Sequence, residues 1–343
     1  MLRVLGIDPG TISLDICGLE DGRVFLDRSI PTAEALRDPQ GIARLLQSIG
    51  PIDLVAGPSG YGLPLVDARD LTEDDVRLAC LSAAGEPGGI GGLADVMRAL
   101  ARTNLRTVFT PGAIHLPSVP EHRKINRIDV GTADKVCAAA LAIHEEAVIQ
   151  ECGPEQVSLI LLELGGAFSA AIAVEHGRIV DGLGGSSGPI GMRGAGALDG
   201  EVAFLAGHVS KEMLFHGGVM DVPGDAGRDA FIEGSVKAVA AMRVSAPSAT
   251  RVLLSGRVAA EAWVHDRLRD ALGAVRVVVG FGSAAKHAAQ GAALIAEGLA
   301  GGEARGLVAT LGIRDASGTV LDHLHVIDRH TAARRLGIHR SAN

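Results

Sequence analysis

The stretch VLGIDPGTISLDICGLEDGRVFLD, residues 4–27, decides the fold of this chain. Apolar segments lie on both sides of Asp8-Pro9-Gly10-Thr11, and a second turn follows at residues 20–23. This pattern predicts three consecutive strands joined by two turns. The first turn can be an ordinary hairpin connection, but its small residues also allow backbone amides to approach an anion such as a phosphate.

The same pattern returns later in the chain, without a gap, as LILLELGGAFSAAIAVEHGRIVD at residues 159–181. Asp8 corresponds to Glu163 and Gly10 to Gly165, because 163 minus 8 and 165 minus 10 both equal 155. A plain duplication of hairpins would repeat the apolar positions and the outer turn. This repeat also keeps an acid followed by a glycine turn at the end of the first strand. We therefore expect two related domains whose glycine turns face each other across a cleft for a polyphosphate.

The composition restricts the class of protein. The 343 residues suffice for two domains, and with 47% hydrophobic but only 3% aromatic residues the core must consist of Leu, Val, Ile and Ala. A net charge of −8 without a long basic run argues against nucleic acid. No apolar run reaches the roughly 18 to 20 residues of a membrane span. The chain enters a strand at once without a charged leader, so we expect a cytoplasmic protein.

The four cysteines, Cys17, Cys80, Cys137 and Cys152, have no C-x-x-C spacing and lie in apolar surroundings. We expect them to be reduced core residues and not a metal or disulfide framework.

Strand and helix patterns alternate over the rest of the chain, which predicts an α/β fold with mixed sheets covered by helices. We expect a first domain at 1–150, a second at 151–330 and a weakly docked tail at 331–343. Residues 307–311 and 319–327 have the pattern of strands. The glycine-rich segment at 86–92 suits a connector or the hinge of a lid.

Several motifs suggest chemistry from their residue types alone. Asp8 and Glu163 end equivalent strands, where carboxylates can position Mg2+ or its waters. Arg193 is the one cation of the glycine-rich segment 184–201 and can reach a phosphoryl oxygen. Asp129 or Asp134, at the start of a predicted helix, can face the cleft. Each of these residues also has a plainer interpretation, as a turn residue, a helix cap or an incidental surface charge.

Further motifs suit the nucleotide. LLSGRVAA at 253–260 is a strand, a Ser-Gly turn and a helix start, which suits a nucleotide lying over the turn but is also a common connector. In GFGSAAKHAAQGAAL at 280–294, Gly291 can open a helix face to a ligand or simply permit close helix packing.

Taken together, these motifs resemble the superfamily of acetate kinases, sugar kinases, heat-shock chaperones and actin, in particular its acetate and butyrate kinase branch. DPGT is similar to the first phosphate motif of that branch, and residues 164–182 are similar to the second. GPIGMRGAGAL at 188–198 resembles a butyrate kinase motif and places Arg193 at the position of its catalytic arginine. LLSGRVAA resembles the adenosine motif, and GPSGYGLPL at 57–65 resembles a glycine loop of the acyl pocket. The resemblance extends over residues 3–303, and the chain is identified with a divergent group of predicted butyrate kinases.

The resemblance implies two duplicated ribonuclease-H-like domains, of the kind found in actin-like ATPases, with ATP and Mg2+ in a cleft between them. It implies phosphoryl transfer from ATP to a small acceptor, with a short-chain carboxylate such as butyrate as the best candidate, and a possible homodimer. The residues expected at the site are Asp8, Asp129, Asp134 and Arg193 for catalysis; Gly10, Thr11, Ser13, Gly165, Gly166, Gly256, Gly282 and Gly291 for the nucleotide; Ser59, Gly60, His115 and Lys135 for the acceptor; and Asp8 and Glu163 for Mg2+.

The chain departs from the pattern of the branch at three positions. Asp8 stands where the branch has Asn, Asp15 where it has Lys, and Val130 where it has His. Replacing a cation by an acid near a transferring phosphate weakens charge stabilisation unless another group substitutes for it. Asp129, next to Val130, can compensate for the histidine.

The departures keep other functions open. A regulatory ATPase of the same fold, which closes on nucleotide without transferring phosphate, would not need the lysine and the histidine. A carbamoyl transferase of the superfamily would need an H-x-x-x-H pair on a helix, and the sequence has no such spacing. A purely structural protein would require the repeated acid-glycine turns to be accidental.

Overall fold

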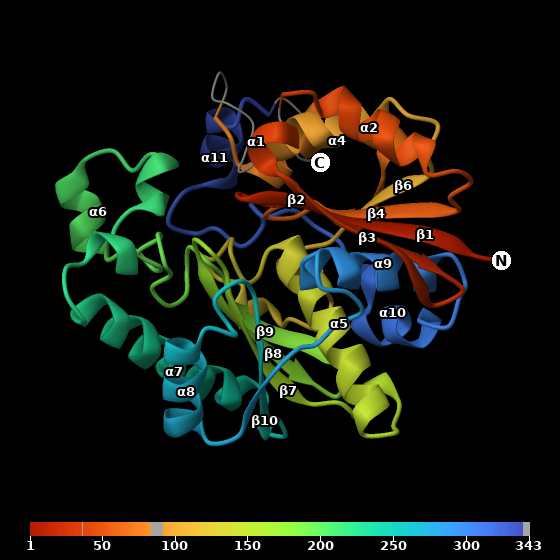
Figure 1. The fold of residues 1–343 in the computed structure, drawn as a ribbon. Coiled ribbons are helices and arrows are strands. Elements are labelled where there is room, and N and C mark those ends of the chain that lie inside the picture. The colour runs from red at the N-terminus through yellow and green to blue at the C-terminus, as the bar shows by residue number, and fades with distance from the viewer. Residues whose placement is uncertain (36, 84–91, 339–343) are drawn as a thin grey trace.

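The computed structural model describes residues 1–35, 37–83 and 92–338, and within them the chain forms two mixed sheets flanked by helices (Figure 1). The expected α/β fold with two duplicated domains is confirmed. The first sheet has the order β3-β2-β1-β4-β6-β5, and the second has the order β9-β8-β7-β10-β11. In both, the first three strands of the unit are antiparallel neighbours and the next strand joins in parallel. Even the bulges correspond, since they follow Gly18 and Ala173, again 155 residues apart.

The bounds of the strands follow the repeat. In the first sheet they are β1 (Arg3–Pro9), β2 (Ser13–Glu20), β3 (Arg23–Pro31), β4 (Leu54–Pro58), β5 (Val66–Asp67) and β6 (Thr107–Thr110). In the second sheet they are β7 (Leu159–Leu164), β8 (Ser169–Glu175), β9 (Arg178–Leu183), β10 (Arg251–Ser255) and β11 (Val275–Val277).

The outer hairpin turns of the two units have the same backbone conformation. Asp21 and Gly22 have φ values of 45° and 74°, and His176 and Gly177 have φ values of 51° and 72°. Two successive residues with positive φ are typical of the tight turn that matches the twist of a two-strand ribbon. The duplication read from the sequence is therefore a duplication of backbone geometry.

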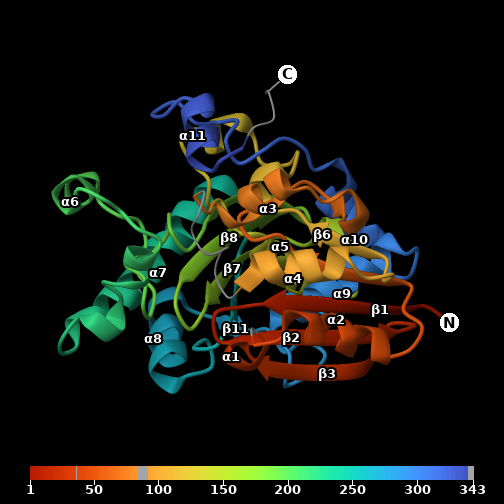
Figure 2. The same ribbon diagram turned by 90° about the horizontal axis from the view of Figure 1, so that it is seen from above.

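The helices form three layers, one on the outer face of each sheet and one between the sheets (Figures 1 and 2). The outer face of the first sheet carries α1 (Thr32–Ala35), α2 (Pro39–Ser48), α3 (Glu73–Cys80) and α4 (Leu93–Ala101). The outer face of the second sheet carries α7 (Ala226–Ser245) and α8 (Ala262–Leu272). Between the sheets lie α5 (Ala133–Ile149), α9 (His287–Leu299) and α10 (Arg305–Leu311). Both views show α6 (Gly200–Ala206) projecting from the body of the molecule.

The strand patterns explain this layering. Leu5 and Ile7 of β1 point to the outer core, whereas Val4 and Gly6 face the layer between the sheets. In a strand, alternate side chains point to opposite faces, so a β1 that is buried on both faces must be apolar throughout.

Helix α9 packs on the first sheet although it follows the second sheet in sequence. At Gly6 an added Cβ would lie 2.1 Å from the carbonyl oxygen of Ala289, and at Gly291 an added Cβ would lie 1.8 Å from that of Cys137. Small residues therefore let α9 approach both β1 and α5 at backbone distance. The helix connects the two units, and a domain boundary near residue 150 stays a prediction.

Three details differ from the sequence predictions. Residues 307–311 are part of helix α10, whose Leu307, Val308 and Leu311 are buried, and residues 319–327 form turns. The start of the predicted weak tail is ordered as α11 (Arg329–Arg335), and Arg77 Nη1 donates to the carbonyl oxygen of Leu336 at 2.9 Å. Short apolar segments suit strands and buried helices alike, which explains the wrong prediction at 307–311. The proposed hinge at 86–92 lies outside the described residues except for Gly92, which precedes α4.

All four cysteines are free, and Cys17, Cys80 and Cys137 are buried, as expected. None of the helices within the described residues is both long and apolar enough to cross a bilayer.

The contact between α5 and α9 can be tested at Gly291. We expect Gly291→Ala to lower the free energy of unfolding by about 3 kcal/mol, because the new methyl group meets backbone atoms that cannot move aside. The measurement is urea unfolding followed by circular dichroism. The matched control is Gly306→Ala on α10, where an added Cβ meets nothing within 4 Å and should stabilise the helix by about 1 kcal/mol. Equal effects of the two substitutions would contradict this packing.

Candidate functional site

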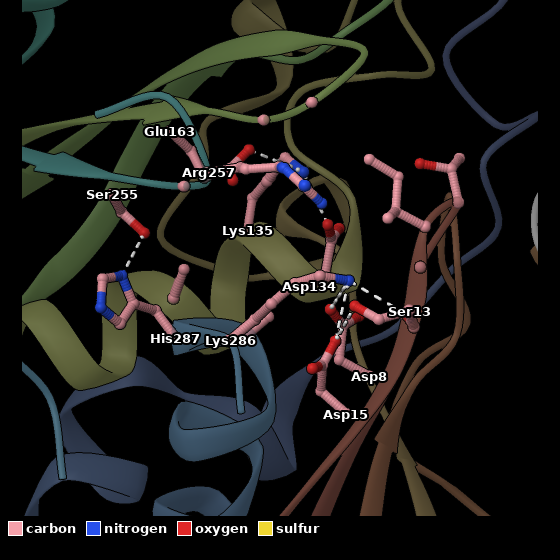
Figure 3. Close-up of a pocket in the computed structure, with 18 of the residues that line it drawn as sticks. Asp8, Ser13, Asp15, Asp134, Lys135, Glu163, Ser255, Arg257, Lys286 and His287 are labelled. Atoms are coloured by element: carbon pink, nitrogen blue, oxygen red, sulfur yellow. Dashed lines mark hydrogen bonds and ion pairs between the residues drawn. The ribbon is translucent and has the colours of Figure 1, made fainter. Parts of the chain in front are cut away.

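A cavity of about 630 Å³ lies where residues of the two units meet (Figure 3). Thirteen of the residues predicted from the sequence line it: Asp8, Gly10, Thr11, Ser13, Gly60, Asp129, Asp134, Lys135, Glu163, Gly165, Gly166, Gly256 and Gly282. Its volume lies within the range typical of small-molecule sites.

The two glycine turns at the cavity have matching geometry. The Gly10 amide donates to the carbonyl oxygen of Ser13 at 2.9 Å, and the Gly165 amide donates to that of Phe168 at 2.9 Å. These four residues are equivalent pairs in the repeat, and all four line the cavity. Each turn joins two antiparallel strands of its sheet, so the sheets hold the turns in fixed positions at the cavity wall.

Lys286, at the start of α9, stands between two buried acids of the first unit (Figure 3). Its Nζ lies 2.9 Å from Asp15 Oδ2 and 3.5 Å from Asp8 Oδ2, and it donates to the carbonyl oxygen of Ser13 at 3.1 Å. Burial lowers the pKa of Lys286, but the charges of Asp8 and Asp15 outweigh this effect and raise it. Lys286 therefore stays a cation directly beside Gly10.

Asp8 is buried, and burial is the main cause that raises its pKa to about 6. Lys286 opposes the shift, while the negative charges of Asp134 and Asp15 add to it. Near neutral pH the carboxylate is thus ionised at a cost to the folded state.

A second lysine is placed between acids on the opposite side. Lys135 Nζ, in the first turn of α5, lies 2.6 Å from Asp134 Oδ2 and 3.0 Å from Glu163 Oε2. Burial disfavours its charge, but Asp134 and Glu163 outweigh this and raise the pKa of Lys135. Burial likewise raises the pKa of Asp134, and the charge of Lys135 more than reverses that effect. Lys135 was predicted at the acceptor, and the structure places it beside the second acid-glycine turn.

One edge of the cavity is formed by the second unit. This edge carries Gly256 and residues 277–279. Ser255 and His287 lie there too, with 2.8 Å between Ser255 Oγ and His287 Nδ1. Burial lowers the pKa of His287, which favours the neutral ring. Arg257 follows Gly256 and also lines the cavity (Figure 3).

The loop that carries Lys286 is fastened to the first unit by Asp27 of β3. The Asp27 carboxylate accepts the amide hydrogens of Ser283 and Ala284 at 2.9 Å and that of Ala285 at 2.7 Å. Three successive amides on one carboxylate fix the loop before α9, and with it the position of Lys286.

The other end of the cavity, which we call the acceptor end, is formed by Gly60, Tyr61, Ala79, Cys80, Leu93, Asp129 and Ser186. Asp129 Oδ2 accepts from both the amide and the hydroxyl of Ser186, at 2.9 Å each. Burial, followed by the negative charge of Asp129, raises the pKa of Tyr61, so its hydroxyl keeps the proton.

Four predicted residues do not line this cavity. Ser59 is buried and donates to the carbonyl oxygen of Thr110 at 2.8 Å, and His115 is buried with Nδ1 3.2 Å from that of Ser317. Gly291 serves the packing of α9 on α5. Arg193 is exposed, with its guanidinium 5.9 Å from the centroid of the Phe215 ring. For Ser59, His115 and Gly291, the structure favours a packing role.

Sequence reasoning missed Lys286, Arg257, Tyr61 and Ser186 as lining residues. Lys286 had a signal in the sequence: it precedes a helix, where the helix dipole disfavours a cation. A lysine at such a position is stabilised when acids face it, which indicates a partner from elsewhere in the fold.

The residues of the cavity fit Mg2+ only in part. Within the described ranges, no three His, Cys, Asp or Glu side chains converge as a ligand set. Mg2+ in nucleotide sites requires less, because one or two carboxylates act together with phosphates and waters. Asp8 satisfies this at the first turn, whereas Glu163 is already paired with Lys135 at 3.0 Å.

Comparison with known proteins gives a family and a fold. The family model described as "Protein of unknown function (DUF1464)" matches residues 6–326. Comparison with curated protein sequences gives no match.

Among solved structures, the chain is similar to a propionate kinase from Francisella tularensis subsp. tularensis SCHU S4, with a TM-score of 0.59, 12% identity, and coverage of 85% of this chain and 98% of that one. It is also similar to acetate kinases from Porphyromonas gingivalis (TM-score 0.55, 15% identity, 78% and 86% coverage) and Entamoeba histolytica (0.53, 14%, 78% and 85%). The shared fold confirms the architecture expected from the resemblance, while the butyrate kinase branch stays a prediction.

The charge of Asp8 should cost the folded protein stability. We expect Asp8→Asn to raise the free energy of unfolding by about 3 kcal/mol at pH 7.5. The reason is that folding raises the pKa of Asp8 from 3.8 to about 6, so keeping the carboxylate ionised costs the folded state this free energy. As the pH falls from 6 to 4, folded Asp8 takes up a proton before unfolded Asp8 does, so most of the gain should disappear. Urea unfolding in EDTA at pH 7.5 and 4.5 measures this.

The control is Asp270→Asn on the exposed side of α8, which should change the free energy of unfolding by less than about 0.5 kcal/mol. A gain for Asp8→Asn that is equal at both pH values would contradict the raised pKa of Asp8.

Proposed function

The chain belongs to this family of proteins of unknown function, and we propose that it is an ATP-dependent phosphotransferase acting on a small acceptor. One observation carries the proposal: two equivalent glycine turns, one from each unit, line a single cavity together with Lys135 and Lys286. Kinase relatives in fold make ATP the natural phosphoryl donor, although their low identity establishes the fold alone.

The cavity supplies what a polyphosphate requires. The small residues of the turns, Gly10, Thr11, Gly165 and Gly166, leave the backbone accessible to phosphate oxygens. Nearby carboxylates stabilise the positive charges of Lys286 and Lys135 in the free protein. Phosphate oxygens can replace those carboxylates as partners of the two lysines. Arg257, exposed at the cavity, offers a further positive charge.

Mg2+ is proposed as the cofactor, held by Asp8 directly or through water and with Glu163 near the opposite turn. When bound, the ion neutralises charge on the transferring phosphoryl group. Asp8 must be ionised for this, and its pKa of about 6 leaves it ionised at neutral pH. The protein's own contribution is to position the donor and the acceptor in line and to stabilise charge.

Arg193 is proposed to stabilise the transition state, as the resemblance implies. In this structure it stacks on Phe215, which in turn packs against Phe168 of the cavity wall with ring centroids 4.8 Å apart. A role at the phosphate therefore requires segment 184–201 to move toward the cavity when substrates bind.

A regulatory ATPase of the same fold is the second candidate. The absence of the branch's lysine and histidine at Asp15 and Val130 favours it. The presence of Asp15 in place of the lysine is weaker evidence for this candidate than it looks, because the ammonium of Lys286 lies 2.9 Å from Asp15. Nucleotide hydrolysis that no acceptor stimulates would support the regulatory ATPase over the kinase.

The acceptor and the assembly state remain predictions. The resemblance favours a short-chain carboxylate such as butyrate, held near Gly60, and a possible homodimer. Within the described residues, the apolar side chains of α6 are exposed.

Binding of Mg-ATP to the full-length protein tests the proposal. We expect calorimetry to detect binding to the wild type, and Lys286→Ala to weaken the affinity at least tenfold, because Asp8 and Asp15 then repel the phosphates without compensation. Lys286→Arg keeps the charge and should retain most of the affinity. Lys237→Ala, on the exposed side of α7, is the control and should change it less than twofold.

No binding of any nucleotide to the wild type would overturn the proposed function. Binding that Lys286→Ala leaves within twofold would exclude Lys286 from the phosphate site.

A further inference from the structure

The acceptor end of the cavity differs in charge from the rest. The cationic side chains that line the cavity are Lys135, Lys286 and Arg257, and each lies at or beside a glycine turn. The acceptor end carries only one ionised group among its described lining residues, the carboxylate of Asp129. The cations at the glycine turns are thus paired with Asp8, Asp15, Asp134 and Glu163, whereas the acceptor end holds a carboxylate without such a pair.

Within the part of the chain that the structure describes, no lysine or arginine forms an ion pair with Asp129. Its Oδ2 accepts two hydrogen bonds from Ser186, a neutral residue. Its Oδ1 is buried against Gly184 and has no hydrogen-bond partner. A buried carboxylate oxygen without a hydrogen-bond partner is costly to the folded state, and a donor on a ligand would satisfy it.

The other polar groups at this end are neutral. Tyr61 keeps its hydroxyl proton, and burial raises the pKa of Cys80 to about 11, so its thiol is protonated as well. Lys211 stacks on the Tyr61 ring, with Nζ 4.7 Å from the centroid, and is not among the lining residues. The sequence of residues 84–91, outside the described ranges, contains neither Lys nor Arg.

We propose that the phosphoryl acceptor is a small, uncharged hydroxyl compound and not a carboxylate. A carboxylate at this end would face the like charge of Asp129, whereas a hydroxyl can donate to Asp129 and accept from Tyr61 or Ser186. The inference rests on the proposed phosphotransferase function and defines its acceptor. It departs from the carboxylate that the sequence resemblance implies.

The transfer step balances with Asp129 as the proton acceptor. The acceptor hydroxyl oxygen forms a bond to the γ-phosphorus of ATP while the bond between that phosphorus and the β–γ bridging oxygen breaks, releasing ADP. The hydroxyl proton passes to the Asp129 carboxylate and from there to solvent. The products are ADP and a phosphate monoester.

The remaining described residues of this end are neutral. Ala79, Cys80 and Leu93 are apolar or neutral, and Gly60 packs so closely that an added Cβ would lie 2.4 Å from the carbonyl oxygen of Ala79. A compound of a few carbons, with its hydroxyl toward Asp129 and its carbon chain toward Leu93, fits this chemistry.

Matched acceptors distinguish the two classes. The full-length protein with Mg-ATP is given glycerol, erythritol or 1-butanol, and in parallel acetate, propionate or butyrate. We expect at least one hydroxyl compound to raise the rate of ADP release tenfold or more, with a phosphate monoester in the 31P NMR spectrum. Addition of hydroxylamine, which traps acyl phosphates as hydroxamates, should then yield no hydroxamate.

Hydroxamate formed with any of the carboxylates would overturn the inference while leaving the phosphotransferase function intact. ADP release that no hydroxyl compound raises more than twofold would also overturn it. The absence of Mg-ATP binding would instead refute the proposed function itself, so the two failures are distinct.

Asp129→Asn tests the charge with little change of shape. We expect turnover with the hydroxyl acceptor to fall at least a hundredfold. Binding of butyrate, measured by calorimetry, should tighten at least threefold because the like charge is gone. Ser186→Ala removes one hydrogen bond but keeps the carboxylate, and should cost less than tenfold in turnover.

A purely structural role for Asp129 would weaken both classes of ligand together. Parallel losses of hydroxyl and butyrate binding in Asp129→Asn would therefore overturn the inference, even if the variant unfolds at a lower temperature.

Discussion

The packing of α9 against β1 and α5 is the contact on which the rest of the structure depends. Gly6 of β1 and Gly291 of α9 lack the side chains that would collide with Ala289 of α9 and Cys137 of α5. Because the approach is this close, a helix from beyond the second sheet becomes the covering layer of the first. The two units therefore share one core between their sheets. The loop that precedes α9 thereby lies next to the glycine turn of the first unit.

This geometry explains an apparent defect in the sequence. Asp15 adds a negative charge beside Asp8, where a phosphate site would suffer from it. The ammonium of Lys286, fastened by the Asp27 contacts of its loop, lies within 3.5 Å of both acids. The cation required at the turn thus comes from a distant segment, and the local sequence carries only the acids. Lys135 between Asp134 and Glu163 repeats the arrangement at the second turn.

Much of the fold could be predicted from the repeat, because a constant offset with an acid, a glycine turn and apolar strands leaves few alternative folds. The glycine turns and both acids of the repeat indeed line the cavity. Prediction failed where a segment is short and apolar on all sides, as at Leu307–Leu311, where local pattern does not separate strand from helix. Gly291 and His115 do not line the cavity, and the sequence could not indicate this, since a small or polar residue looks the same whether it serves packing or a ligand.

The sequence by itself determined the duplicated units and the positions of their glycine turns. These properties depend on residues close together in the chain, whose periodicity and size are visible directly. Only the tertiary structure decided which charges neutralise one another and which carboxylate remains without a cation. Lys286 meets Asp15 across 271 residues of chain, the difference between their positions, while among the described residues Asp129 accepts hydrogen bonds from neutral Ser186. Electrostatic energy depends on distance in space, and the packing of α9 between the sheets sets that distance.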